Sequence, residues 1–224
     1  MKKFLSGFLT ACLALTAVQS QAALVITGII DGGLSGGLPK AVELFASTDI
    51  ADLSVYSIDN ANNGGAFDGT VITLSGSAVA GQYLYAASEA TGFNTYFGFA
   101  PNFTGSSLNI NGDDVVGLFQ AAALVDVFGV VGVDGTGQAW DYLDGWAYRL
   151  DGTGPSVTFN TAEWTFSGID ATDGTATVAA TGFPFGTYQA ATAVPEPSSL
   201  AVLGLIGAAG AVVRRRRAAA AIAD

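Results

Sequence analysis

The chain has 224 residues, half of them apolar and only 12% charged, which indicates one or two folded domains and excludes a disordered polymer. It contains no histidine, which excludes Ser-His and Cys-His nucleophiles and His-ligated zinc sites. Residues 23–194 carry 2 basic and 17 acidic residues, a net charge of −15, so we expect no nucleic acid as a partner.

Residues 1–22 have the pattern of a secretory signal peptide. Lys2 and Lys3 precede an apolar stretch, and small residues favour cleavage after Ala22, so we expect a signal helix that is removed on export. A lipid anchor at Cys12 is the alternative, but the apolar run continues beyond Cys12. With ordinary cleavage the only cysteine leaves with the signal, and the mature protein has no disulfide.

Short β-branched and aromatic runs follow, separated by Gly, Asn, Asp and Ser. This is typical of an antiparallel β-sandwich or barrel. The expected strands are Leu24–Ile30, Ala41–Ala46, Leu53–Ile58, Thr70–Leu74, Tyr83–Ala87, Val115–Gln120, Leu124–Val130 and Trp146–Leu150, with Val157–Phe166 as a final strand region. Alternation within Ala41–Ala46 predicts that Val42 and Leu44 face opposite to Glu43 and Phe45.

The remaining segments of this region predict loops and one helix. Gly32–Gly37 and Asp59–Gly65 are expected to be loops, because Gly and Asn adopt turn conformations easily. A short helix is expected around Glu89–Tyr96, and residues 169–193 are expected to form a weakly structured edge or linker after a domain at 23–168.

The order of the runs resembles bacterial lamin-tail domains. The similar pieces include Ala41–Phe45 with Asp52–Ile58, Leu74–Gly76 with Gln82–Ala86, Asn111–Phe119, Val125–Gly129, Trp146–Arg149, and Phe159 with Glu163–Trp164. The resemblance spans about residues 24–167 and implies an immunoglobulin-like β-sandwich. In that family the domain is an accessory module of secreted and surface proteins, without catalytic residues of its own.

Acidic residues are the main candidates for chemistry. Paired carboxylates such as Asp113 and Asp114 would be needed by a hydrolase, and Asp-rich loops with Asp126, Asp134, Asp141 and Asp144 would supply oxygens to calcium. The favoured interpretation is that these side chains form turns by hydrogen bonding to the nearby backbone, with Asn111–Asp114 as a hairpin turn before a strand. We therefore expect no catalytic residue, no resident metal and no cofactor, and calcium is the open alternative.

Two cations and four aromatic residues complete the candidates. Lys40 and Arg149 are each expected to pair with a carboxylate, with Glu43 as a partner for Arg149. Trp146 and Tyr148 are expected to be strand residues. Trp140 and Tyr142 lie in the Gly-rich loop 135–145 and are the candidate exposed ligand contacts, as a platform that stacks on sugars.

The C-terminus has the pattern of a second sorting signal. Pro195, Glu196 and Pro197 precede an apolar stretch, Leu200–Val213, that is short for a membrane span, and four arginines follow at Arg214, Arg215, Arg216 and Arg217. Arginines stop transfer on the cytoplasmic side. The apolar stretch is expected to be helical and to anchor the chain transiently in the inner membrane.

Residues 194–217 resemble the PEP-CTERM sorting signal of Gram-negative bacteria, followed here by a tail at 218–224. The resemblance implies recognition by exosortase, a membrane cysteine transpeptidase, after export by the secretion machinery, and removal of the tail near Pro195–Pro197. The expected location is the outer surface or the extracellular space, with exopolysaccharide as the implied setting.

Two function classes follow. The first is a non-enzymatic adhesion or structural protein of an exopolysaccharide matrix. The second is an accessory module or weak carboxylate-based hydrolase that acts on an extracellular polymer.

Overall fold

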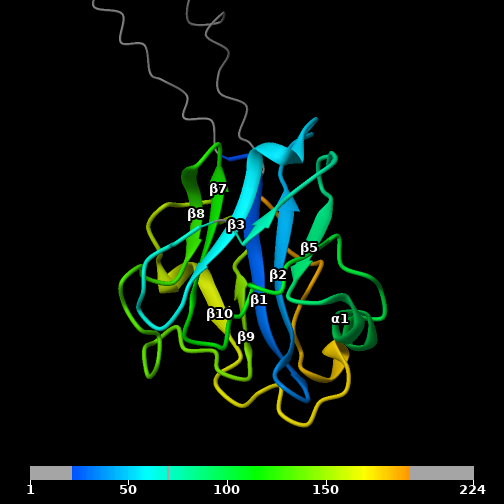
Figure 1. Ribbon diagram of the computed structural model, residues 1–224, viewed down its shortest axis with the longest axis vertical. Helices are drawn as coiled ribbons and strands as arrows, with labels where there is room; N and C mark the ends of the chain where they lie inside the picture. The colour runs from blue at the N-terminus through cyan, green and yellow to red at the C-terminus, as the bar shows by residue number, and fades with distance from the viewer. Residues whose placement is uncertain (1–21, 70, 192–224) are drawn as a thin grey trace, which may run out of the picture. The chain divides into compact units, whose positions relative to one another are not determined.

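A computed structural model describes residues 22–69 and 71–191, which fold mainly as two β-sheets (Figure 1). The six-stranded sheet has the order β10-β9-β1-β2-β5-β6 and the four-stranded sheet the order β4-β3-β7-β8. The bounds are β1 (Leu24–Leu34), β2 (Leu38–Ala46), β3 (Tyr56–Ala61), β4 (Ile72–Thr73), β5 (Tyr83–Ala87), β6 (Phe103–Thr104), β7 (Val115–Gln120), β8 (Ala123–Phe128), β9 (Trp146–Arg149) and β10 (Trp164–Phe166). All pairings are antiparallel except that of β5 with β6. The expected all-β sandwich is thus confirmed as two sheets.

The main core lies between the two sheets. Val42, Leu44 and Ala46 of β2 meet Ile58 of β3 and Leu118 of β7 there, and all five are buried. Glu43 and Phe45 face the other way, as the alternation predicts for a strand whose side chains point alternately to opposite faces. The inner residues give the domain one continuous apolar layer.

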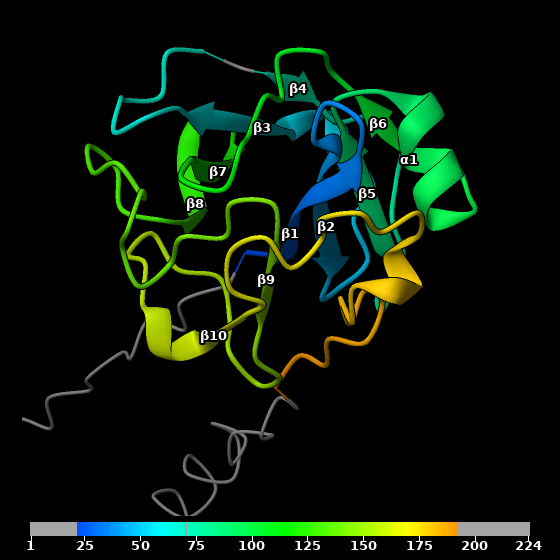
Figure 2. The ribbon, with the colours of Figure 1, turned by 90° about the horizontal axis from the view of Figure 1, so that it is seen from below.

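The outer face of the six-stranded sheet is also covered. Helix α1 (Ala90–Phe97) packs on it, as Figure 2 shows beside β5, and its N-terminus is capped by Glu89, whose carboxylate accepts from Gly92 N and Phe93 N. This confirms the helix expected around Glu89–Tyr96. Because both faces of this sheet are covered, β1 and β2 are buried along almost their whole length.

Residues 170–190, the C-terminal strap, cover the rest of that outer face. The strap contains one 3-10 helix, η3 (Val178–Ala180), and buries Val178, Phe183 and Tyr188 in a second aromatic core with α1. The expectation of a weakly structured edge or linker is wrong for these residues. Their Thr-, Gly- and Ala-rich sequence forms no strand, yet widely spaced large side chains hold the strap on the sheet.

Several expected boundaries also change. Gly32–Gly33 belong to β1, which continues to Leu34 and pairs it with Leu38, and Asp59–Ala61 belong to β3 and pair with β7. The segment before β3 starts with a 3-10 helix, η1 (Leu53–Val55), and the final strand region is only β10, preceded by η2 (Thr161–Glu163). Glycine allows the close approach in β1, since a Cβ at Gly33 would lie 1.9 Å from Thr172 O.

Both ends of this domain leave from the same end of the sandwich (Figure 1). Val25 pairs with Phe45, Phe45 pairs with Tyr83, and the Tyr83 hydroxyl donates to Tyr188 O at 2.5 Å. The expected signal helix and sorting helix lie outside the described residues. Within the described residues, no helix has the length and apolarity needed to cross a membrane.

Candidate functional site

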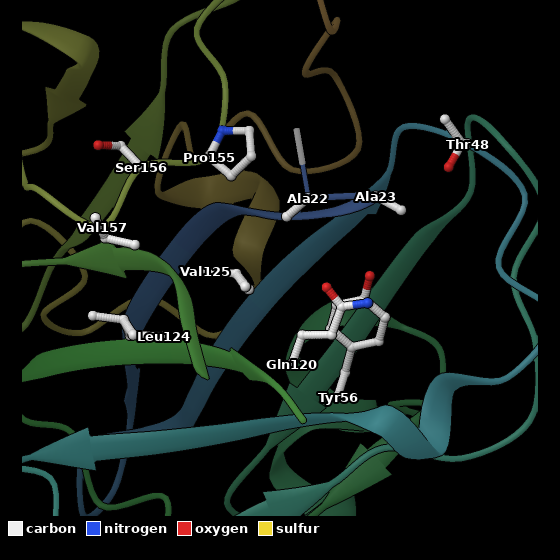
Figure 3. Close-up of a pocket in the computed structure, with 10 residues that line it drawn as sticks. All are labelled: Ala22, Ala23, Thr48, Tyr56, Gln120, Leu124, Val125, Pro155, Ser156 and Val157. Carbon is white, nitrogen blue, oxygen red and sulfur yellow. The ribbon is translucent and has the colours of Figure 1, made fainter. Parts of the chain in front are cut away.

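An open pocket of about 680 Å³ lies at the end of the sandwich where the chain enters β1 (Figure 3). Its lining is neutral and mixed in polarity, and consists of Ala22, Ala23, Thr48, Tyr56, Gln120, Leu124, Val125, Pro155, Ser156 and Val157. Open concave sites with a few polar groups in an apolar lining are the usual form of ligand sites. This pocket is the main candidate for binding.

Local structure holds each wall of the pocket in place. Asp52 caps η1 by accepting from Ser54 N at 2.8 Å, which sets Tyr56 at the start of β3. The tight connection from β7 to β8 places Ala121 and Ala122 at positive φ, so Gln120 and Leu124 lie on one rim. The entry to β1 is held because Ala23 O accepts from Ser47 N at 2.8 Å and from Ser47 Oγ at 3.1 Å.

Tyr56 is the titratable side chain of the pocket lining. Burial raises the pKa of its hydroxyl, and the backbone amide of Ala23 partly offsets that effect. Figure 3 shows the polar ends of Tyr56 and Gln120 turned toward the Ala22–Ala23 segment. At neutral pH the phenol is therefore protonated and offers a hydrogen bond, which suits binding.

A buried ion pair forms the support behind the pocket. Asp126 accepts from Arg149 Nη2 at 2.7 and 2.8 Å and also from Ile26 N and Ser156 N, while Arg149 donates to Ile26 O and Gly154 O. Burial raises the pKa of Asp126, and the guanidinium opposes that rise. The pair thus ties β8, β1 and the 154–156 loop together.

Glu43 is not the partner of Arg149, contrary to the expectation. It lies on the outer face of β2 and accepts from Thr27 Oγ1 at 2.7 Å, Tyr148 Oη at 3.0 Å and Gly186 N at 2.6 Å. Burial raises the pKa of this carboxyl. Glu43 therefore fastens the C-terminal strap, and Arg149 points to the opposite side of the sheet. The pairing expected for Lys40 is confirmed, with Asp31 at 2.9 Å.

Trp140 and Tyr142 are not exposed, so the sugar-stacking platform expected there is wrong. They are 3% and 0% exposed and pack edge-on against Phe128 in the main core, at 5.9 and 5.4 Å between ring centres. The Gly-rich loop folds over the end of the sandwich and carries the two rings inward. Trp146 and Tyr148 are strand residues of β9, as expected.

The candidate carboxylates take part in turns. Asp114 accepts from Asn63 N at 2.8 Å and Asn111 N at 3.0 Å, and Asp113 accepts from Thr136 Oγ1 at 2.9 Å. Turn chemistry is therefore found at Asn111–Asp114, although the turn leads into β7 without joining two paired strands. The expectation that this turn belongs to a hairpin is wrong.

The other Asp-rich loops show similar local bonding. Asp134 accepts from Thr136 N at 2.9 Å, Asp141 accepts from Gly137 N at 2.7 Å, and Asp144 has a positive φ of 45°. Among residues 22–69 and 71–191, no group of three His, Cys, Asp or Glu side chains converges on one point.

Asp114 predicts a pH dependence of stability. Burial raises the pKa of its carboxyl to about 6 from 3.8. The folded state therefore holds this proton more tightly than the unfolded state, so the stabilisation is complete below pH 4 and is lost as the pH rises through 6. We expect Asp114→Asn to flatten the fall in melting temperature between pH 4 and 6.

Asp52→Asn serves as the control for that measurement, because the pKa of the exposed Asp52 is lowered by its bonds to Ser54. The control should keep the fall seen in the unchanged protein. An Asp114→Asn variant with the same pH profile as the unchanged protein would contradict the assignment.

The sequence did not point to the pocket. Its walls come from the Ala22–Ala23 segment before β1, Thr48 after β2, the strands β3, β7 and β8, and the 155–157 loop, and none of its side chains forms a recognisable motif. One signal was present, because the expected cleavage after Ala22 falls directly before the first strand. Ala22 and Ala23 do lie at the pocket; Pro195–Pro197 and Arg214–Arg217 lie outside the described residues.

Comparison with known proteins identifies one segment of the chain. Residues 193–217 match the PEP-CTERM protein-sorting motif. No curated protein and no solved structure matches the chain. The motif confirms the sorting signal inferred from Pro195–Pro197, the apolar stretch and the arginines, and it indicates an exported protein that exosortase processes.

Proposed function

We propose that the processed protein is a non-enzymatic surface or extracellular-matrix protein with an adhesion or structural role in an exopolysaccharide matrix. The sorting motif supports the setting, because it indicates an exported, exosortase-dependent protein. Transient anchoring in the inner membrane would precede removal of the tail. The proposal also takes the sandwich as immunoglobulin-like and of the lamin-tail kind, a family of accessory modules without catalytic residues.

The observation that carries this proposal is the charge distribution of the sandwich. Its two cationic side chains, Lys40 and Arg149, are 8% and 2% exposed and are both held in ion pairs. Five of its 17 carboxylates are buried, which leaves 12 at least partly accessible to solvent. Such a surface repels an acidic polymer directly and attracts it through divalent cations that bridge two carboxylates.

The hydrolase alternative has less support. Asp113 and Asp114 are engaged by backbone and hydroxyl donors of the turn, and Asp114 is fully buried. A catalytic pair of carboxyls has to flank a substrate in an open site. The proposed role is therefore adhesion by many weak contacts between numerous copies and the matrix.

Sedimentation with the native matrix tests this proposal. The processed protein is expected to pellet with matrix in 5 mM calcium, a concentration on the order of those at which extracellular calcium modules are loaded, and to pellet much less in excess chelator. High monovalent salt should weaken the calcium-dependent binding, because exposed charges are screened. Equal pelleting in calcium and in chelator would exclude the cation bridge, and no pelleting in either would exclude the matrix role.

A further inference from the structure

We propose that cleavage after Ala22, which removes that residue from the lining, leaves the new α-ammonium of Ala23 at the pocket, where it binds the carboxylate of a uronic-acid sugar. This inference rests on the proposed function, because it names the sugar class that a matrix protein would recognise. Its site is distinct from the acidic surface on which calcium bridging depends.

The Ala23 nitrogen has a defined position in the folded domain. The Ala23 carbonyl is held by two bonds from Ser47, and Leu24, the next residue, pairs with Ala46 in the sheet. Ala23 and Tyr56 both line the pocket, and the Tyr56 side chain is turned toward the Ala22–Ala23 segment (Figure 3). Cleavage after Ala22 turns this same nitrogen into an ammonium beside Tyr56.

The ammonium would be the accessible cation of an otherwise acidic domain. The described residues contain two cationic side chains, and both are buried in ion pairs. No acidic side chain lines the pocket, so no lining carboxylate competes for the ammonium. An unperturbed α-amino group has a pKa of about 7.7–8.0, so most of it is charged at neutral pH. An anionic ligand can therefore form a direct ion pair here without a bridging metal.

The rest of the lining fits a sugar ring. Thr48 and Gln120 offer a hydroxyl and an amide that both donate and accept, as sugar hydroxyls require. The Ser156 hydroxyl donates to Thr158 O and accepts from Thr158 N, so it has one further lone pair for a sugar hydroxyl. Leu124, Val125 and Val157 supply the apolar wall that the C–H side of a ring would contact, and Val157 is 60% exposed. A volume of about 680 Å³ lies within the roughly 300–1,000 Å³ range of small-ligand sites. These neutral polar groups around one cation favour a uronic acid over a peptide carboxylate, whose backbone would need a row of aligned partners.

The test uses the protein after removal of its signal peptide and sorting tail, with its N-terminus established by sequencing. The probe is a trisaccharide of galacturonic acid, and binding is measured in the presence of chelator. Calorimetry should show at least tenfold tighter binding of this probe than of a neutral glucose trisaccharide. A glycine inserted between Ala22 and Ala23 keeps the charge but moves the amine by about 3.8 Å, and it should reduce the affinity at least tenfold.

Gln120→Glu and Gln138→Glu form a matched pair of variants. Both add one negative charge, but the first places it in the pocket beside the ammonium, and the second places it in an exposed loop outside the lining. Only Gln120→Glu should weaken binding of the galacturonate. Binding by the unchanged protein should also decline from pH 7 to 9 as the amine loses its proton, with Tyr56 still protonated because the pKa of its hydroxyl is raised.

Four results would overturn the proposal. They are a mature N-terminus other than Ala23, equal affinity for the acidic and neutral trisaccharides, full binding by the glycine-insertion variant, and tighter binding of a tripeptide with a free carboxylate than of the galacturonate. The proposed function is judged separately, because calcium-dependent pelleting with matrix should persist in the glycine-insertion variant. If the unchanged protein does not bind the galacturonate but still pellets with matrix in calcium, the pocket proposal alone is removed.

Discussion

Replacement of Arg149 by methionine is expected to lower the free energy of unfolding by about 3–5 kcal/mol, because it leaves the buried Asp126 without its counter-ion. Arg149 is 2% exposed and Asp126 is 0% exposed. The guanidinium also donates to Ile26 O and Gly154 O and lies 4.5 Å from the centre of the Trp164 ring. Methionine replaces part of the apolar volume but none of these donors. Urea denaturation followed by tryptophan fluorescence measures the loss.

Glu163→Gln is the control for that experiment. Glu163 also approaches Arg149, at 3.8 Å, but its side chain is 31% exposed. Pairs of this kind contribute about 0–1 kcal/mol, because solvent screens them. A loss below about 1 kcal/mol for Arg149→Met, or equal losses for the two variants, would contradict the role assigned to the buried pair.

Replacement of Phe183 by alanine is expected to cost about 3–5 kcal/mol, the usual range for a large aromatic removed from a core. Phe183 is 5% exposed and its ring lies 5.7 Å from that of Trp146 and 5.5 Å from that of Tyr148. It also lies against Gly28, where a Cβ would meet the Phe183 ring at 2.6 Å. Thermal and urea unfolding of the processed protein measure the change.

Ile169→Ala is the matched control at the start of the same region of the chain. Ile169 is 56% exposed, so its truncation should change stability by no more than about 0.5 kcal/mol. If Phe183→Ala is equally harmless, residues 170–190 are a linker after all. A large loss only at Phe183 shows that the C-terminal strap belongs to the folded domain.

Local patterns were sufficient for most strands and for the C-terminal sorting motif. The expected strands Tyr83–Ala87 and Val115–Gln120 coincide with β5 and β7, and Ala41–Ala46 lies within β2, because alternation and short-range propensity are properties of neighbouring residues. The short helix expected around Glu89–Tyr96 likewise agrees with α1 (Ala90–Phe97). The sorting motif at 193–217 is read from residue order alone, since it is recognised as a linear segment.

Contacts between distant residues decided the rest. Whether Trp140 and Tyr142 face solvent depends on how their loop closes over Phe128, and the partner of Arg149 is 23 residues away on another sheet. The C-terminal strap has no strand pattern, yet it is buried because Glu43, Tyr148 and the rings of Phe97 and Trp146 hold it from distant parts of the chain. The pocket itself arises where three strands, two loops and the segment before β1 meet, and a local sequence pattern does not encode contacts between segments more than 100 residues apart.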